Sequence, residues 1–232
     1  MIIIPARLAS SRFPNKILAN IGGYPMVIAT ANRVKELDKV AIATDSSEVF
    51  NLVKDYGYEA VMTSSKHKSG TDRINEAANK LALKDDEIII NVQADEPLIE
   101  PEVVKAVIDK VKDQKCFMAS CYKLIDKSFA TDPNHVKVIT DANNYAIYFS
   151  RSKIPYDRDE YNSYYGHLGI YGFRKKSLNE FCSLPTSPLE DIEKLEQLRA
   201  IYHGKKIAMV QVESESFGVD TKEDLQRVLA RV

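Results

Sequence analysis

The 232-residue sequence contains no tryptophan, only three cysteines, and only nine glycines and nine prolines. So little glycine and proline excludes a collagen-like chain and a disordered, low-complexity one. The cysteines are an odd number without a Cys-x-x-Cys pair and the four histidines are dispersed, so neither a disulfide framework nor a zinc site is expected. This usage is typical of a cytoplasmic protein whose cysteines, here Cys116, Cys121 and Cys182, are apolar core residues.

The sequence also lacks a long apolar run and an excess of either charge. No run of about 18 apolar residues is present, so membrane insertion is not expected. Residues 1–7 lack the basic stretch and long apolar core of a signal peptide. Lysine and arginine number 32 against 33 aspartates and glutamates, which argues against a broad cationic face for nucleic acid. The length suits one compact domain, with or without a sizeable insertion.

In the first half, short apolar runs alternate with longer amphipathic stretches. Continuous Ile/Val runs predict strands that are covered by helices on both faces, and strand–helix alternation predicts a largely parallel sheet. The predicted strands are residues 1–5, 39–44, 59–62 and 87–92, and the predicted helices are residues 25–36, 46–56, 70–81 and 101–111. These elements define an α/β fold.

The second half has a different pattern, in which segments rich in Tyr, Val and Ile are separated by polar stretches. It predicts antiparallel strands and a hairpin inserted into the α/β domain. The predicted strands are residues 116–124, 135–140, 145–150, 168–173 and 206–212, and the predicted helices are 189–202 and 222–232. We therefore expect a single α/β domain over residues 1–232 that carries a β-rich excursion at about residues 122–175.

The loop after the first predicted strand concentrates cations. Arg7, Arg12 and Lys16 lie in one short connection, with Ser10 and Ser11 between them. Three cations with interleaved hydroxyls suit a polyphosphate, and ligands collect at the carboxyl ends of parallel strands. The loop is not a Walker A sequence, and a solvated surface loop is the alternative.

Carboxylates follow the fourth predicted strand and recur near the C-terminus. Asp95 and Glu96 come to the same edge of the sheet as the basic loop, where hard oxygen ligands near phosphates hold Mg²⁺; a turn closed by Asp and Pro is the alternative. Asp220 or Thr221 is a good helix N-cap, and Asp220 is a metal candidate only if folding brings it to Asp95. Residues 69–73 open a helix whose N-terminus favours an anion, and their small side chains allow close approach of a base or ribose.

Six motifs occur in order along the chain: PARLASSRFPNK, SGTDR, NVQADEP, HLGIYGF, LEDIEKLEQLR and GVDT. Together they resemble the 3-deoxy-manno-octulosonate cytidylyltransferases, also called CMP-Kdo synthetases. The opening motif is shared with acylneuraminate cytidylyltransferases, whereas HLGIYGF and LEQLR point to the Kdo branch. The resemblance covers essentially the whole chain. It implies a three-layer, Rossmann-like nucleotide-diphospho-sugar transferase fold, a mainly parallel sheet, and an inserted β-rich segment that mediates a homodimer.

The resemblance also implies a reaction, in which the anomeric hydroxyl of Kdo attacks the α-phosphorus of CTP. The products are pyrophosphate and CMP-Kdo for lipopolysaccharide synthesis. It assigns catalytic roles to Arg7, Arg12, Lys16, Asp95 and Asp220, the two aspartates holding Mg²⁺. The nucleotide-binding residues are expected to be Pro5, Ala6, Arg7, Ser10, Lys16, Ser69, Gly70, Thr71 and Arg73. The sugar-binding residues are expected to be Gln93, Arg151, His167, Glu196 and Gln197.

Two positions depart from the family pattern. Ala94 stands where the family has glycine, and Gly166 stands where a basic residue is common. These departures leave the identity of the sugar substrate undecided, with 8-amino-Kdo or a sialic-type acid as alternatives to Kdo. A catalytically silent nucleotide-binding homologue is a further alternative, against which the retained aspartates and basic loop argue.

Overall fold

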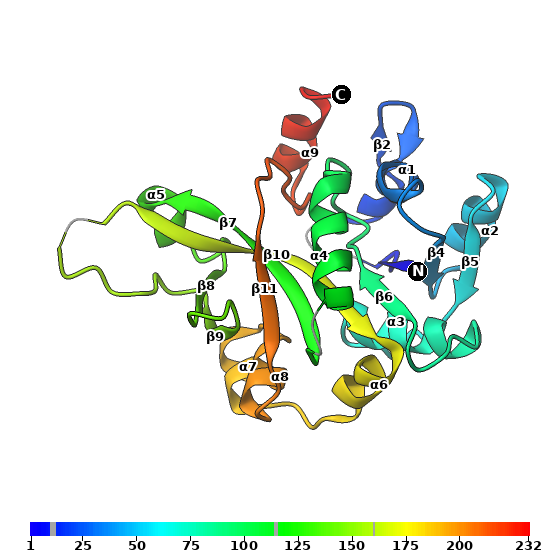
Figure 1. Ribbon diagram of the computed structural model, residues 1–232. Coiled ribbons are helices and arrows are strands. Elements are labelled where there is room, and N and C mark those ends of the chain that lie inside the picture. Colours follow the sequence, from blue (N-terminus) through cyan, green and yellow to red (C-terminus); the bar gives the residue numbers. More distant parts are fainter. Residues whose placement is uncertain (10–12, 114–115, 160) are drawn as a thin grey trace.

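The computed structural model describes residues 1–9, 13–113, 116–159 and 161–232 (Figure 1). Within these ranges one large sheet has the strand order β11-β7-β10-β6-β1-β4-β5, and β8 and β9 extend it from β10. The strands of the main path are β1 (Ile2–Ala6), β4 (Val40–Thr44), β5 (Glu59–Met62), β6 (Ile88–Asn91), β7 (Met118–Asp126), β10 (Ser163–Arg174) and β11 (Ile207–Gln211). A separate hairpin pairs β2 (Asn20–Ile21) with β3 (Tyr24–Pro25).

The sheet is mostly parallel, as the sequence predicts. β1 pairs in parallel with β4 and β6, β4 with β5, and β7 with β11. On the main path the exception is β10, which lies antiparallel between β6 and β7. The strands that extend the sheet are antiparallel as well, since β8 pairs in this way with β10 and β9. β10 begins at Ser163, five residues before the predicted start.

Helices cover both faces because side chains of a buried strand alternate between the faces. Ile2 and Ile4 of β1 pack into one apolar core with α1, α2 and α4, whereas Ile3 packs into another with α3, α6 and α8. The first group is α1 (Met26–Val34), α2 (Ser47–Asp55) and α4 (Pro101–Asp113), and α4 lies in front of the sheet in Figure 1. The second is α3 (Gly70–Lys80), α6 (Lys175–Ser183) and α8 (Leu198–Tyr202). These three layers confirm the predicted fold class.

The prediction of one long helix over residues 189–202 is wrong. The structure has α7 (Pro188–Glu193), which Ser187 caps through a capping box with Glu190, and then α8. Lys194 adopts a left-handed backbone with φ 54°, which ends α7 after six residues. The break lets Leu195 and Gln197 turn into the protein, where both are buried. The sequence analysis also missed α5 (Lys127–Thr131), α6 and the 3-10 helix η1 (Lys16–Leu18).

A β-rich segment projects from the body of the molecule (Figure 1). It contains the outer parts of β7 and β10, together with α5, β8 (Lys137–Thr140) and β9 (Ala146–Ser150). Lys137 of β8 is fully buried, and its ammonium group donates hydrogen bonds to the carbonyls of Asp132, His135 and Arg151. Buried charge is tolerated here because three acceptors replace water. α9 (Lys222–Leu229) ends the described helices, and none of these is long and apolar enough to cross a membrane.

Gly172 is a position where the packing of α4 on β10 requires glycine. A Cβ atom there would lie 2.5 Å from Val111 Cγ2 and 3.0 Å from Val107 Cγ1. We predict that Gly172→Ala lowers the free energy of unfolding by about 2 kcal/mol, because overpacking displaces the helix. Urea denaturation measures the loss. Gly169→Ala is the matched control, since nothing lies within 4 Å of its Cβ position, and equal stability of the two variants would contradict the prediction.

Candidate active site

A pocket of about 300 Å³ lies where β1 and β6 end and α3 begins. This is the edge at which ligands of parallel α/β sheets bind. Four cationic side chains and two carboxylates line it, so the pocket favours an anion. The lining residues are Pro5, Arg7, Ala9, Lys16, Ile17, His67, Lys68, Ser69, Gly70, Arg73, Gln93, Ala94, Asp95 and Asp220.

The opening motif contributes Arg7 and Lys16 to this pocket. Arg7 follows β1 directly and is exposed. Lys16 begins η1 after Asn15, whose left-handed backbone (φ 57°) turns the chain back toward the sheet; asparagine tolerates this conformation better than most residues. Ser10 and Arg12, which the sequence assigns to the nucleotide, lie outside the described residues.

The ammonium group of Lys16 lies between the two predicted metal-binding carboxylates. Its Nζ is 2.5 Å from Asp95 Oδ2 and 3.0 Å from Asp220 Oδ1, and it also donates to the carbonyl of Val219 at 2.9 Å. Burial opposes the charge on Lys16, but the two carboxylates outweigh this effect and raise its pKa. Folding therefore brings together Asp95 and Asp220, which are 125 positions apart in the chain.

Asp220 does not cap the last helix. Thr221 is the N-cap of α9: its hydroxyl accepts from the amide of Asp224, and the carboxylate of Asp224 accepts from the amide of Thr221. The sequence allows either Asp220 or Thr221 as the N-cap, and in the structure the N-cap is Thr221. The carboxylate of Asp220 is directed to Lys16 instead.

The donor set at this point fits a hard cation. Two carboxylate oxygens converge on one ammonium nitrogen, which stands in for a cation at hydrogen-bonding distance. The described residues contain no cluster of three His, Cys, Asp or Glu side chains able to hold a metal ion. Two carboxylates suit Mg²⁺ nevertheless, since it takes its remaining ligands from water and phosphate oxygens.

The start of α3 forms another part of the pocket wall. Ser69 caps the helix by accepting from the amide of Asp72, so the helix N-terminus lies at the pocket. Gly70 packs against Pro5, where a Cβ atom would lie 3.0 Å from Pro5 Cγ. Arg73 is only 3% exposed and is held by Asp45 at 2.8 Å and by the hydroxyl of Thr63 at 2.7 Å.

His67 and Lys68 line the pocket, and the sequence analysis missed both. The imidazole Nε2 of His67 contacts the carboxylate of Glu76, which also accepts from the amide of Ser64 and pairs with Lys80. Burial opposes ionisation of Glu76, but these partners outweigh it and lower its pKa to about 2. The sequence signal that could have placed them at the pocket is their position, because residues 67 and 68 directly precede the Ser-Gly start of a predicted helix.

Three of the predicted sugar-binding residues join a network of buried polar groups. Gln93 Nε2 donates to Asn91, Asn91 donates to Thr71, and Thr71 donates to Glu196 Oε1 at 2.6 Å. The next residue, Gln197, accepts from the hydroxyl of Tyr171. Glu196 Oε2 and Gln197 Nε2 are buried without a hydrogen-bond partner among the described residues. Burial raises the pKa of Glu196. Neither Glu196 nor Gln197 lines the pocket, and such buried polar atoms normally find a partner, such as an ordered water or a polar ligand.

His167 lies beside this network, with its ring 5.6 Å from that of Tyr171. Its Nε2 is 2.8 Å from the hydroxyl of Ser120. The carbonyl of Ile170 is an acceptor 2.8 Å from the same hydroxyl, so we assign the neutral Nε2–H tautomer, in which Ser120 accepts from His167 and donates to Ile170. Desolvation lowers the pKa of His167 to about 3.

This pKa predicts a pH dependence of stability. Between pH 6.5 and 3 the unfolded chain binds a proton at His167 that the folded protein does not bind, so stability falls as the pH drops. His167→Gln removes this contribution. We expect the difference in unfolding free energy between the wild type and His167→Gln to shrink by about 2 kcal/mol from pH 7 to pH 5. Urea denaturation at both pH values measures it, and a constant difference would contradict the prediction.

Arg151 lies apart from this network. Its guanidinium donates to the carbonyls of Pro133, Glu193 and Lys194, and its amide donates to Glu193 Oε2. These contacts brace the turn between α7 and α8. A sugar-binding role for Arg151 stays a prediction.

The other predicted positions are buried near the pocket or away from it. Ala6 is fully buried at the end of β1, and Ala94 lines the pocket with 4% of its surface exposed. Gly166 lies on β10, where a Cβ atom would be 2.8 Å from Ile125 Cγ2. Ile125 thus fills the space that a side chain at position 166 would enter.

Comparisons with known proteins place the chain in a family. The sequence model of the family described as Cytidylyltransferase matches residues 1–207. The chain therefore belongs to the cytidylyltransferase family and is a nucleotidyltransferase.

Individual relatives are more specific. A relative from a Nitratiruptor species, named 3-deoxy-manno-octulosonate cytidylyltransferase, is 58% identical over 99% of this chain and 98% of its own length. A relative of the same name from Wolinella succinogenes is 52% identical over 99% of this chain and 98% of its own. A solved structure of CMP:2-keto-3-deoxy-manno-octonic acid synthetase complexed with CTP matches with a TM-score of 0.93 at 38% identity, covering 99% of this chain and 96% of that one. The resemblance predicted from the six motifs is confirmed.

Proposed function

We propose that this enzyme transfers CMP from CTP to the anomeric hydroxyl of Kdo, releasing pyrophosphate and giving CMP-Kdo for lipopolysaccharide synthesis. The observation that carries the proposal is a cationic pocket with two converging carboxylates next to a buried polar network. The names of the relatives and of the CTP-bound structure support the same reaction.

The cations of the pocket bind and orient the triphosphate. CTP and a sugar carboxylate are both anionic, so their approach is repulsive unless positive charge lies between them. Arg7, Lys16 and Lys68 line the pocket and supply that charge, and the opening motif adds Arg12 and Ser10. Arg73 and the start of α3 hold the cytidine against Pro5. Fixed charges also stabilise the α-phosphoryl group and the departing pyrophosphate.

Asp95 and Asp220 are the residues that would hold Mg²⁺. When bound, the ion supplies positive charge that lowers the pKa of the attacking hydroxyl and neutralises phosphate oxygens. Lys16 contacts both carboxylates; with an ion held there, its ammonium group would be available to phosphate oxygens of CTP.

The buried network binds the sugar. Gln93, His167, Glu196 and Gln197 offer donors and acceptors of hydrogen bonds, and two of these atoms have no partner in the described part of the protein. Sugar hydroxyls satisfy such atoms, and a site with unpaired buried polar groups discriminates strongly against a ligand that lacks the matching group.

Pyrophosphate release tests the function directly. The purified enzyme is incubated with CTP and Mg²⁺ and with Kdo, 8-amino-Kdo or a sialic acid in parallel. Release with Kdo supports the proposal. Faster release with 8-amino-Kdo or the sialic acid would show that this acid, and not Kdo, is the preferred substrate. No release with any acid, combined with CTP-dependent thermal stabilisation, would identify a silent nucleotide-binding homologue.

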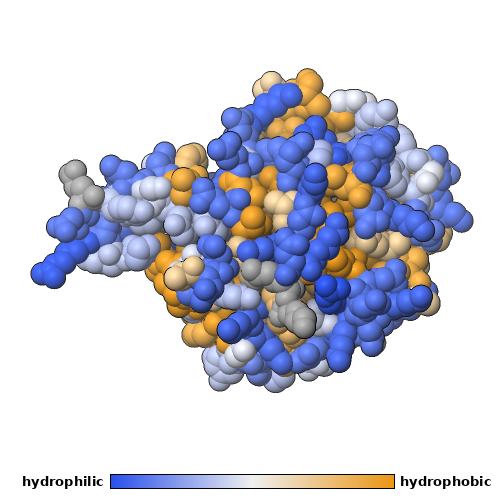
Figure 2. Space-filling model, viewed as in Figure 1, coloured by the Kyte–Doolittle hydropathy of each residue, from blue (hydrophilic) through white to orange (hydrophobic). Residues whose placement is uncertain are grey.

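We also propose a cytoplasmic homodimer built from one α/β domain and the β-rich excursion of residues 122–175. The three cysteines are free, which agrees with a reducing compartment. Exposed apolar side chains gather on the excursion, and Figure 2 shows apolar surface near its base. They are Leu124, Phe129, Ile147, Tyr156 and Tyr161. Sedimentation equilibrium measures the oligomeric state, and a monomer at micromolar concentration would contradict the dimer.

A further inference from the structure

Asp220 lies on a segment without helix or strand. Residues 212–221, here called the strap, connect β11 with α9 and form the irregular chain above β11 in Figure 1. Asp95 lies closer to the sheet, in the turn that begins shortly after the buried strand β6 ends at Asn91. Two ligands of one ion must keep their geometry to within about 0.5 Å. The strap therefore needs contacts that fix it relative to the sheet.

Lys123 and Glu100 hold the strap from two elements of the body. Lys123, on β7, donates from Nζ to the carbonyls of Ser214 (3.0 Å) and Ser216 (3.3 Å). Glu100, just before α4, accepts from the hydroxyl of Ser214 and from the amide of Glu215, both at 2.8 Å. The ammonium group of Lys123 thus binds acceptors of the strap, and the carboxylate of Glu100 binds donors of the strap. We call this pair the clamp.

The contacts continue from the clamp to the metal-binding carboxylates. The hydroxyl of Ser216 donates to Glu96 at 3.2 Å, and the amide of Val219 donates to the carbonyl of Asp95 at 2.9 Å. Val219 is fully buried, and its carbonyl accepts from Lys16. The position of the strap thus determines where Asp220 lies relative to Asp95.

The clamp is built around a charge in a partly desolvated place. Burial lowers the pKa of Lys123, and the carboxylates of Glu100, Glu96 and Glu215 oppose this effect. Lys123 and Glu100 line a surface groove of about 430 Å³. Because neither side chain fills the apolar core, a substitution that shortens or neutralises it leaves no cavity in the core. The ammonium group of Lys123 forms its hydrogen bonds with the backbone of the strap, and these bonds serve to place it.

We propose that Lys123 and Glu100 are positioning residues of the transfer reaction, which set Asp220 against Asp95 and so determine the affinity of the site for its divalent cation. The inference rests on the proposed function. It assigns to residues outside the pocket a role that no motif of the sequence indicates. Loss of a group that hydrogen-bonds a metal ligand typically changes metal affinity 10–100-fold, and the clamp acts on Asp220 through the strap.

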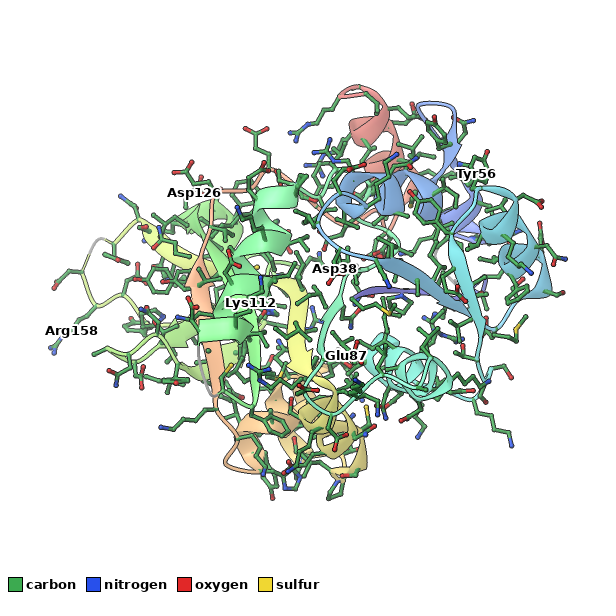
Figure 3. The ribbon with its side chains drawn as sticks, turned by 45° about the vertical axis from the view of Figure 1, so that its right-hand side comes forward. Asp38, Tyr56, Glu87, Lys112, Asp126 and Arg158 are labelled. Carbon is green, nitrogen blue, oxygen red and sulfur yellow. The ribbon has the colours of Figure 1, made fainter. Side chains whose placement is uncertain are left out.

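The test compares Lys123→Met, Lys123→Arg and Glu100→Gln with the control Lys112→Met. Lys112 is exposed on α4 and pairs only with Asp109 among the described residues (Figure 3). We expect Lys123→Met to raise the Mg²⁺ concentration for half-maximal pyrophosphate release about 10-fold, while the KM for CTP at saturating Mg²⁺ changes little. Lys123→Arg should restore most of the affinity, Glu100→Gln should weaken it, and Lys112→Met should behave as the wild type.

Two further readouts do not depend on turnover. Mn²⁺ titrated into the nucleotide-free protein should bind Lys123→Met more weakly than the wild type, and the amide of Val219 should exchange with solvent faster in the variant. A lower melting temperature with unchanged metal affinity and unchanged Val219 exchange would show that the clamp is merely structural and would overturn the proposal. If the wild type releases no pyrophosphate, the proposed function fails. Mn²⁺ binding and Val219 exchange would still show whether the clamp positions the metal site.

Discussion

Asp95→Asn should lower kcat by at least about 10³-fold while the protein keeps its fold. Removal of one preorganised group that stabilises charge in a transition state lowers kcat by about 10²–10³-fold, and this substitution also weakens the proposed Mg²⁺ site. Asp95 is three-quarters buried and lies 2.5 Å from Lys16. Asparagine has the same shape, so the backbone contact from Val219 to the carbonyl of residue 95 is retained.

The measurement is steady-state pyrophosphate release with CTP and Kdo over a range of Mg²⁺ concentrations. Asp109→Asn is the matched control, because the side chain of Asp109 on α4 is half exposed and its ion pair with Lys112 is at 3.4 Å. Circular dichroism and the melting temperature report on the fold of both variants. Activity of Asp95→Asn within threefold of the control would remove Asp95 from the metal site.

Lys16→Met should have the second largest effect, a loss of about 10²–10³-fold in kcat/KM for CTP. Lys16 is the cation that contacts both carboxylates of the site, and phosphate binding requires a charge that methionine does not supply. The nucleotide-free variant should also respond more strongly to Mg²⁺. Without the ammonium group, Asp95 and Asp220 repel each other, and a divalent cation relieves that repulsion.

Thermal unfolding with and without Mg²⁺ measures this second effect independently of activity. The melting temperature of Lys16→Met should rise more on addition of Mg²⁺ than that of the wild type, and Lys112→Met should follow the wild type. An equal rise in Lys16→Met and wild type would mean that Lys16 does not stand in for the cation.

The sequence predicts most of the sheet and its main helices because their signals are local. The Ile-rich run of β1 and the caps Ser46 and Ser69 are visible in the sequence, and the structure places these elements within one or two residues of the predicted bounds. The break between α7 and α8 was missed. Glutamates at helical spacing favour one long helix, but burial of Leu195 and Gln197 requires a left-handed turn at Lys194.

The sequence by itself determined the residue types of the site, namely a basic loop after the first strand, Asp95 after the fourth, and the six ordered motifs that identify the family. These features depend on residue identity and order, which a linear reading contains. Tertiary structure decided that Asp220 meets Asp95 around Lys16, that Thr221 caps α9, and that Lys123 and Glu100 hold the strap. Such contacts join residues up to 204 positions apart. Only the packing of the sheet and its helices brings them within hydrogen-bonding distance.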